Sequence, residues 1–254
     1  MKNEVAIFLL SVQFLTRFPV PAANLIFTPE RLNASARYYP MVGFIIGGLC
    51  AGTFWMLLGL MPEFLALSLS IAVGLLLTGA FHEDGLADTF DGIGGGQDRK
   101  HALAIMKDSR LGTYGTLALG MALSIKFASL SSMPSDWIII ALILGHGVSR
   151  LSSVMAIASG HYVHIDGKTK TVAEGISTTS LTVAMMTGLI GVLAASFFLP
   201  LYALGVGLIV TGVGHLGMRL FFEPKLGGYT GDTLGAIQQA SEIGFYLGLV
   251  AWLG

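Results

Sequence analysis

The chain has 254 residues, of which 54% are hydrophobic and only 11% are charged, and its mean hydropathy is +0.75. Soluble domains carry about a quarter charged residues, so this composition argues against an ordinary soluble domain and favours a polytopic membrane protein. The formal net charge of −1 gives no reason to expect a nucleic-acid partner. Cys50 is the single cysteine, which excludes an intrachain disulfide and a cysteine-based zinc site.

Residues 5–15 form a short apolar stretch near the N-terminus. A bilayer span needs roughly 20 apolar residues, so we expect an interfacial or re-entrant helix here, with an eighth span as the alternative. The basic segment and the A-x-A-like cleavage site of a signal peptide are both missing, so we expect the stretch to be retained.

Seven further windows are long and apolar enough to cross a bilayer. They are residues 39–61, 64–81, 113–130, 137–158, 181–200, 201–220 and 233–254. The last is the weakest, because Gln238, Gln239 and Glu242 interrupt it. The expected fold is all-α: a polytopic integral membrane helix bundle of about seven transmembrane helices plus the N-terminal helix, in a single domain of residues 1–254.

The loops between these windows differ in charge. The loops at 13–38, 81–112, 159–180 and 219–232 hold most of the Lys and Arg residues, whereas those near 62–63, 131–136 and 200 hold none. Basic residues in short loops mark the cytoplasmic side. We therefore expect a multi-pass protein of the bacterial cytoplasmic (inner) membrane, with its active site on the cytoplasmic side. Lys126, near the outer end of its window, is expected to snorkel and to need no functional role.

The densest charge lies in FHEDGLADTFDGIGGG, residues 81–96, directly after the second window. If that span continues as a helix, Asp84, Asp88 and Asp91 fall within an arc of about 60°, and Glu83 points about 100° away. Clustered carboxylates repel each other unless a divalent cation binds them, and hard oxygen ligands suit magnesium or manganese. Magnesium usually binds one or two carboxylates together with substrate phosphates. The stretch therefore predicts a Mg²⁺ site for a pyrophosphate-containing substrate, with a solvated acidic helix end as the alternative.

Three basic residues in the middle of the chain are candidates for binding phosphate oxygens. Lys107 and Arg110 flank Asp108 before the third long window, where anchoring of the span is the alternative. Arg150 lies about 12 Å inside its window and is expected to face a protein interior or an aqueous cavity. The alternative for Arg150 is a structural ion pair with Glu242 or with one of the aspartates.

The last polar loop contains Arg219 and the segment GGYTGDT, residues 227–233. Its glycines allow close backbone approach, and Asp232 and Thr233 offer oxygen ligands. A turn in which Asp232 caps the final helix is the alternative. His146 is expected to be a hydrogen-bonded interior histidine, and the other histidines have no consistent metal-ligand spacing.

Three segments of this chain resemble the cobalamin synthase family, the adenosylcobinamide-GDP ribazoletransferases of the bacterial vitamin B12 nucleotide-loop pathway. They are HEDGLADTFDG (82–92), IMKDSRLGTYG (105–115) and GYTGDTLGA (228–236). The first two are long and highly specific, the third is shorter, and the resemblance runs over essentially the whole chain.

The resemblance implies a magnesium-dependent transfer between two substrates at a lipid bilayer. The 3′-hydroxyl of α-ribazole or of its 5′-phosphate attacks the cobinamide-side phosphate of adenosylcobinamide-GDP. GMP leaves, and adenosylcobalamin or its 5′-phosphate forms. The sequence leaves open a homo-oligomer and an association with other enzymes of the same pathway.

We assign roles from the residue pattern and the resemblance together. Asp84, Asp88 and Asp91 are the predicted magnesium ligands, and Glu83 is either a further ligand or a residue that orients them. The base that accepts the ribose hydroxyl proton is Asp108 or Asp232, which the sequence does not separate. The predicted substrate-binding residues are Lys107, Arg110, Tyr114, Arg150, Arg219, Tyr229 and Thr230.

Two other functions fit parts of the sequence. DTFDG (88–92) is similar to the start of the motif of CDP-alcohol phosphotransferases, which would release CMP while making phospholipid, but the rest of that pattern is not found. A cation transporter would need polar groups near both membrane faces, and only Glu63, Asp136 and Glu242 suggest them.

Overall fold

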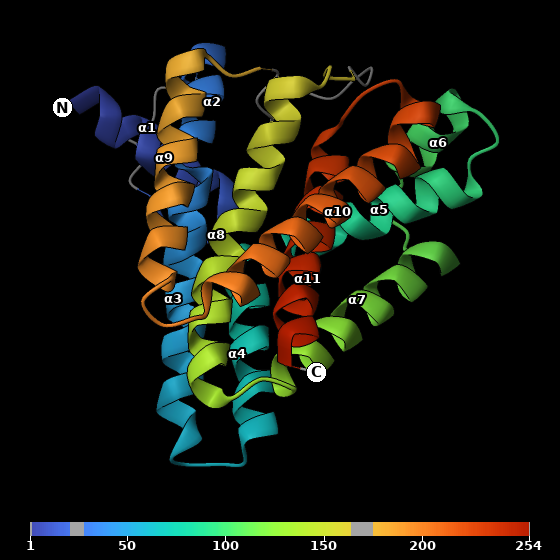
Figure 1. Ribbon diagram of the computed structural model, residues 1–254. Coiled ribbons are helices and arrows are strands. Elements are labelled where there is room, and N and C mark those ends of the chain that lie inside the picture. Colours follow the sequence, from blue (N-terminus) through green and yellow to red (C-terminus); the bar gives the residue numbers. More distant parts are fainter. Residues whose placement is uncertain (1, 21–27, 164–174, 254) are drawn as a thin grey trace.

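The computed structural model describes residues 2–20, 28–163 and 175–253, and these are mostly helical (Figure 1). The described residues contain no β-strand; an isolated bridge pairs Tyr162 with Tyr229. The predicted all-α class is confirmed. The helices are α1 (Lys2–Leu15), α2 (Pro29–Ser35), η2 (Ala36–Tyr38), α3 (Tyr39–Leu58), α4 (Glu63–Thr78), α5 (Phe81–Gly95), α6 (Arg99–Ile105), α7 (Thr113–Ser131), α8 (Ser135–Ser159), α9 (Thr178–Ala195), α10 (Leu201–Leu226) and α11 (Gly231–Leu253).

Membrane-spanning length and composition are found in fewer helices than the sequence predicted. Four segments qualify among the described residues: Pro29–Leu58, α8, α9 and α10; α4 and α5 together form a bent fifth candidate. Helices α7 and α11 do not qualify, because Lys126 lowers the hydropathy of α7, and two glutamines and Glu242 lower that of α11. The prediction of about seven spans is therefore corrected to four or five. Helix α1 has only 14 residues, in keeping with the predicted short N-terminal helix.

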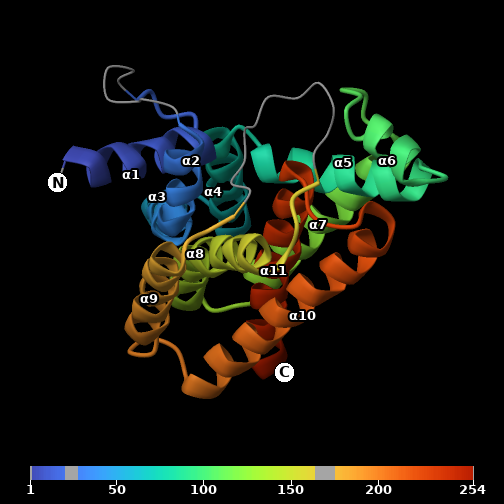
Figure 2. The ribbon, with the colours of Figure 1, turned by 90° about the horizontal axis from the view of Figure 1, so that it is seen from above.

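Helix α11 is the element around which the bundle is arranged. It packs against α5, α7, α8 and α10, while α3 packs against α4, α8 and α9. Seen from above, α11 lies between α8 and α10, with α5 and α6 beyond it (Figure 2). Residues of α11 therefore contact helices from both halves of the chain.

Helix α4 ends at Thr78 and does not continue into the acidic segment, although such a continuation was the condition for the predicted arrangement of the aspartates. Gly79 and Ala80 both adopt left-handed backbone conformations, with φ of 65° and 55°, and α5 runs at 84° to α4. The acidic segment therefore forms a helix of its own, α5, which lies across the upper part of the bundle in Figure 1. The helical spacing of its aspartates is preserved, but their direction is set by this bend.

The bend predicts an unusual response to mutation at Ala80. A left-handed conformation costs a residue with a Cβ about 1–2 kcal/mol, which glycine avoids. We expect Ala80→Gly to raise the free energy of unfolding by up to about 1 kcal/mol, and the bulkier Ala80→Val to lower it. Thermal unfolding in detergent measures both changes, and an Ala80→Gly variant less stable than the native chain would contradict this reading.

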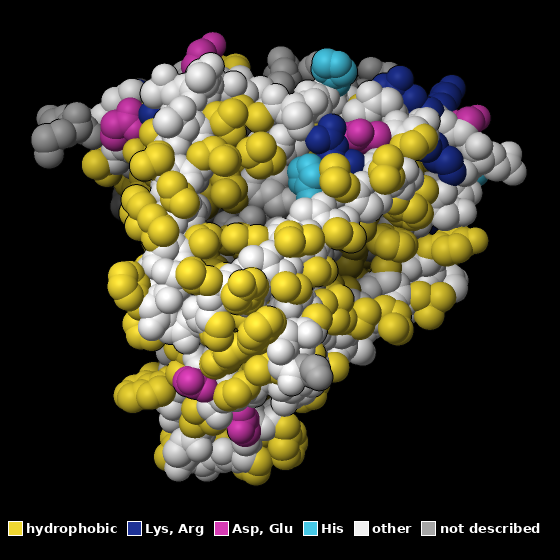
Figure 3. Space-filling model, viewed as in Figure 1, with side chains coloured by type: hydrophobic (Ala, Val, Ile, Leu, Met, Phe, Trp, Pro, Cys, Tyr) yellow, Lys and Arg dark blue, Asp and Glu magenta, His cyan; other side chains and the backbone are white. Residues whose placement is uncertain are grey.

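The surface separates into an apolar body and a charged upper end. In the face shown in Figure 3, Lys and Arg side chains gather at the upper end, and only acidic charged side chains mark the lower end. Large apolar side chains such as Leu76, Phe197 and Leu220 are 74–85% exposed on the body. Exposed apolar area on this scale is typical of a surface in contact with lipid.

Candidate functional site

The three aspartates of α5 share one face of the helix but not one environment. Asp84 is exposed, Asp88 is half-buried and Asp91 is buried. Asp84 and Asp88 are four residues apart, so their side chains are neighbours on the helix surface. These two carboxylates form the accessible part of the predicted site.

Asp91 is held by the backbone at the start of α7. Its Oδ2 accepts a hydrogen bond from the Gly112 N–H at 2.7 Å, and its Oδ1 accepts one from the Gly115 N–H at 2.8 Å. A carboxylate at a helix N-terminus satisfies otherwise unpaired N–H groups and favours the helix dipole. A Cβ at residue 112 or 115 would collide with this carboxylate, which explains both glycines of the LGTYG segment. The structure thus gives Asp91 a structural role, and its predicted metal binding stays a prediction.

This role makes the effect of Asp91→Asn different from that of a purely catalytic change. The amide nitrogen cannot accept one of the two backbone hydrogen bonds, and the charge at the helix N-terminus is lost. Loss of a capping side chain costs about 0.5–2 kcal/mol, so we expect a drop in thermal stability of this size. Asp84→Asn is the matched control and should leave the unfolding temperature unchanged, because Asp84 is exposed.

The first turn of α11 lies directly against α5. A Cβ on Gly85 would lie 2.6 Å from the Asp232 carbonyl oxygen, and one on Gly235 would lie 3.0 Å from the His82 carbonyl oxygen. Only glycine allows the two backbones to approach so closely. Because Gly85 sits between Asp84 and Asp88 in sequence, this contact places Asp232 beside the acidic helix.

The residues just before Asp232 are buried and hold the start of α11. Thr230 and Thr233 cap the helix reciprocally: the Thr230 N–H donates to Thr233 Oγ1 at 2.8 Å, and the Thr233 N–H donates to Thr230 Oγ1 at 3.2 Å. The Tyr229 backbone bonds to residues 161 and 163. Thr230, rather than Asp232, therefore caps this helix, and substrate contact by the buried Tyr229 and Thr230 stays a prediction.

The basic segment before α7 lies on the surface. Arg110 binds the Asp108 carboxylate through Nε at 3.0 Å and through a second guanidinium nitrogen at 2.5 Å. The hydrogen bonds from Arg110 lower the pKa of Asp108 below its ordinary value. Lys107 and Tyr114 are exposed, and the Tyr114 ring packs over Gly94. Lys107 and Tyr114 are therefore accessible to a substrate at this surface.

Helix α10 supplies two basic residues with different roles. Arg219 binds Glu223 at 2.6 Å and the Ser159 hydroxyl at 2.7 Å, so its predicted contact with substrate remains a prediction. Lys225 donates to the carbonyl oxygens of Ile93 and Gly96 at 2.7 and 2.8 Å. Lys225 thus caps the C-terminal end of α5, a role that was not predicted from the sequence.

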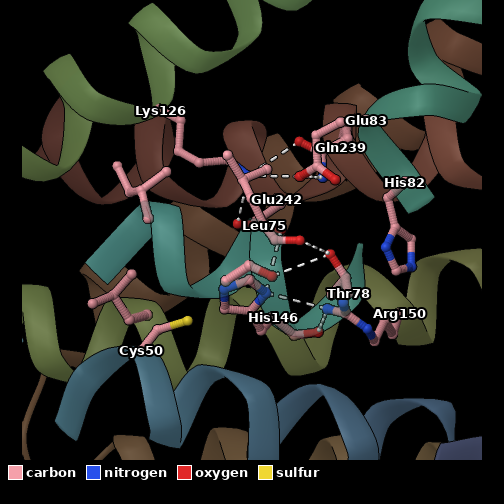
Figure 4. A pocket seen from close by; sticks show the side chains of 13 residues that line it. Cys50, Leu75, Thr78, His82, Glu83, Lys126, His146, Arg150, Gln239 and Glu242 are labelled. Atoms are coloured by element: carbon pink, nitrogen blue, oxygen red, sulfur yellow. Dashed lines mark hydrogen bonds and ion pairs between the residues drawn. The ribbon is translucent and has the colours of Figure 1, made fainter. Parts of the chain in front are cut away.

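A buried polar cluster lies between α5, α7, α8 and α11 (Figure 4). Lys126 is 5% exposed and binds Glu242 and Gln239, each at 3.1 Å. The prediction that Lys126 snorkels to the interface is therefore wrong, because a buried carboxylate on α11 satisfies its charge. Glu83 points into the same cluster, where its Oε1 accepts from Gln239 at 2.9 Å.

Arg150 also belongs to this cluster. It is 1% exposed, and its guanidinium lies 3.2 Å from His146 Nδ1 and 3.0 Å from the His146 carbonyl oxygen. No ion pair joins Arg150 to a carboxylate in the described part of the chain, so the alternative of an ion pair with Glu242 is not what the structure shows. His146 is a hydrogen-bonded interior histidine, as predicted. Contact between Arg150 and a substrate phosphate stays a prediction that would require the bundle to open.

The accessible carboxylates suit a metal ion that binds together with substrate phosphates better than a metal ion held by protein ligands alone. Among the described residues, no group of three His, Cys, Asp or Glu side chains is arranged to hold a metal ion. Asp84 and Asp88 remain as two accessible carboxylates on one helix face. Two carboxylates suit magnesium that arrives with substrate phosphates, and they do not suit a cage built from protein ligands alone.

Comparison with known sequences identifies the family. The profile of the cobalamin-5-phosphate synthase family matches residues 7–250. The chain belongs to the cobalamin-5-phosphate synthase family. It is 37% identical to the adenosylcobinamide-GDP ribazoletransferase of Shewanella woodyi over 99% of this chain and 98% of that protein. It is 41% identical to the protein of the same name from Leptothrix cholodnii, over 98% and 96%. No solved structure matches the chain.

All three motif segments, 82–92, 105–115 and 228–236, lie inside the matched region. In the structure these segments form one neighbourhood, because Asp91 joins the first to the second and Gly85 joins the first to the third.

Proposed function

We propose that this chain is an adenosylcobinamide-GDP ribazoletransferase, which joins α-ribazole or its 5′-phosphate to the cobinamide phosphate in the last assembly step of cobalamin. Relatives of that name cover nearly the whole chain. The observation that supports a site for this reaction is the meeting of α5, the 105–115 segment and the start of α11, which brings the three motif segments together.

The charge distribution supports an orientation in the membrane. Lys and Arg side chains gather at the end of the bundle where α5 lies, in the face that Figure 3 shows. Positive charge marks the cytoplasmic side. We therefore place the reaction on the cytoplasmic face of the bacterial inner membrane, where its water-soluble substrates are available.

Asp84 and Asp88 are the residues that we assign to magnesium. Their carboxylates are accessible and adjacent, and a pyrophosphate would supply the remaining oxygen ligands. Bound there, magnesium would neutralise pyrophosphate oxygens and stabilise GMP as it leaves. Lys107 and Arg110, on the neighbouring surface, contribute positive charge toward the same phosphates.

Asp232 is the residue that we assign as the proton acceptor. Asp108 is less suited, because Arg110 binds both of its carboxylate oxygens and holds its pKa low. The ribose 3′-hydroxyl gives its proton to Asp232 while its oxygen forms a bond to the cobinamide-side phosphorus. The bond from that phosphorus to the bridging oxygen breaks, and GMP leaves with the electron pair.

A nucleotide-release assay separates this function from its rivals. Purified protein in lipid is given adenosylcobinamide-GDP and α-ribazole, with and without magnesium, and GMP is measured. We expect GMP and a cobalamin product only when both substrates and magnesium are present. CMP release from CDP-diacylglycerol, or ion flux in vesicles without nucleotide, would instead support the phosphotransferase or the transporter.

A further inference from the structure

The buried polar cluster joins α5 to two other helices through charged groups that the proposed reaction does not use. Lys126 Nζ of α7 lies 3.1 Å from Glu242 Oε1 of α11 and 3.9 Å from Glu83 Oε1 of α5. The three side chains are only 1–12% exposed. Gln239 links them further, because its amide donates to Glu83 while its carbonyl accepts from Lys126.

The formal charges in this cluster cancel. Glu83 and Glu242 carry two negative charges, and Lys126 and Arg150 carry two positive charges, with His146 between Arg150 and Glu242. Removing one member of a buried ion pair leaves an uncompensated buried charge, which is strongly unfavourable. Removing both members leaves no uncompensated charge. We therefore expect a single mutation that removes one charge of the cluster to be more harmful than a pair of mutations that removes one positive and one negative charge.

Glu83 faces the interior of the bundle and not the surface that carries Asp84. Its Oε2 is buried, has no hydrogen-bond partner within the described part of the chain, and lines a cavity of about 20 Å³, which has room for about one water. In Figure 4 Glu83 lies beside Gln239, while Thr78 of α4 and His146 of α8 line the same cavity from other helices. The side chain therefore anchors the inner face of α5.

The position of this anchor matters because α5 follows a bend. Glu83 lies in the first turn after Gly79 and Ala80, so it is the point at which the bundle can fix the rotation of α5 about its own axis. Asp84 and Asp88 are rigidly related to Glu83 by the helix. A rotation that freed Glu83 would turn both aspartates away from their present direction.

We infer that Glu83, Lys126 and Glu242 are positioning residues for the proposed transfer, on which this inference rests. Their charge-balanced contacts fix the rotation of α5, so that Asp84 and Asp88 face the substrate surface. Glu83 itself does not bind the metal. Misplacement of a reacting group by about 1 Å can cost about 10²-fold in rate, so disturbing the cluster should lower kcat far more than it changes KM.

The test is a charge-cancelling pair of mutations. Glu83→Gln and Lys126→Met are made singly and together. The matched control is Asp136→Asn, which removes an exposed carboxylate from the first turn of α8. We expect each single variant to lose about 10²-fold in kcat, with KM and the magnesium concentration for half-maximal rate within about threefold of the native values. The double variant should be at least about tenfold faster than Glu83→Gln alone, because it restores charge balance.

A metal-binding Glu83 gives the opposite pattern. Glu83→Gln would then raise the magnesium requirement, and Lys126→Met would not relieve the loss. A double variant with a kcat equal to that of Glu83→Gln, or lower, overturns the inference. The comparison of these two variants remains possible even if the Lys126→Met single variant fails to fold. The pair Glu242→Gln with Lys126→Met, compared with Glu242→Gln alone, repeats the test away from the aspartates. An inactive native protein would instead refute the proposed function.

Discussion

Asp84→Asn and Asp88→Asn are each expected to lower the rate of GMP release by about 10²–10³-fold, as loss of one preorganised electrostatic contact to a transition state does. Each change removes a negative charge from the accessible carboxylate pair to which we assign magnesium. Neither change should prevent folding, because Asp84 is exposed and Asp88 is half-buried, and surface substitutions usually shift stability by less than about 0.5 kcal/mol.

The rate is measured at saturating magnesium, and the unfolding temperature is measured on the same samples. Asp136→Asn is the control, because it removes an exposed carboxylate from the first turn of α8 and should leave the rate unchanged. Near-native GMP release by both Asp84→Asn and Asp88→Asn would contradict the assignment of these residues. Asp91→Asn is expected to differ from them, since it also weakens the start of α7.

Gly85→Ala is expected to give the second large effect. The new Cβ would lie 2.6 Å from the Asp232 carbonyl oxygen, so the first turn of α11 must move away from α5. Overpacking of this kind costs about 1–3 kcal/mol. Because Asp232 moves with that turn, we also expect about a 10²-fold loss in kcat.

Gly120→Ala on α7 is the matched control for this change. Among the described residues, no heavy atom beyond the neighbouring residues and backbone of its own helix lies within 4 Å of the position where its Cβ would be. Alanine also favours a helix over glycine by about 1 kcal/mol. Gly120→Ala should therefore be neutral or slightly stabilising, with native activity. Native stability and activity for Gly85→Ala would show that α5 and α11 are not packed through this contact.

The periodicity of the acidic segment could be predicted because it depends on local helix geometry alone. Asp84 and Asp88 are accessible on the same face of α5, and Glu83 points elsewhere, as the spacing indicated. The bend before α5 could not be predicted, because Ala80 is not a residue that normally adopts a left-handed conformation. The direction of the whole acidic helix therefore had to come from the structure.

The buried cluster shows a different limit of sequence reasoning. Lys126 and Glu242 are 116 positions apart and become partners only because α7 packs against α11. Charged residues within apolar windows were the available signal, since they usually face a protein interior. That signal was used for Arg150 and was set aside for Lys126. Likewise, the link from Asp91 to Gly112 and Gly115 depends on packing between α5 and α7, which spacing does not reveal.

The central claim is that the ribose hydroxyl attacks the cobinamide-side phosphorus and displaces GMP. It is tested most directly with α-ribazole that carries ¹⁸O in its 3′-hydroxyl, incubated with adenosylcobinamide-GDP, magnesium and the protein in lipid. The predicted result is that the label appears in the new phosphodiester of the cobalamin product, with unlabelled GMP released in equal amount. Label in the released nucleotide, a product without label, or the absence of GMP would contradict the account.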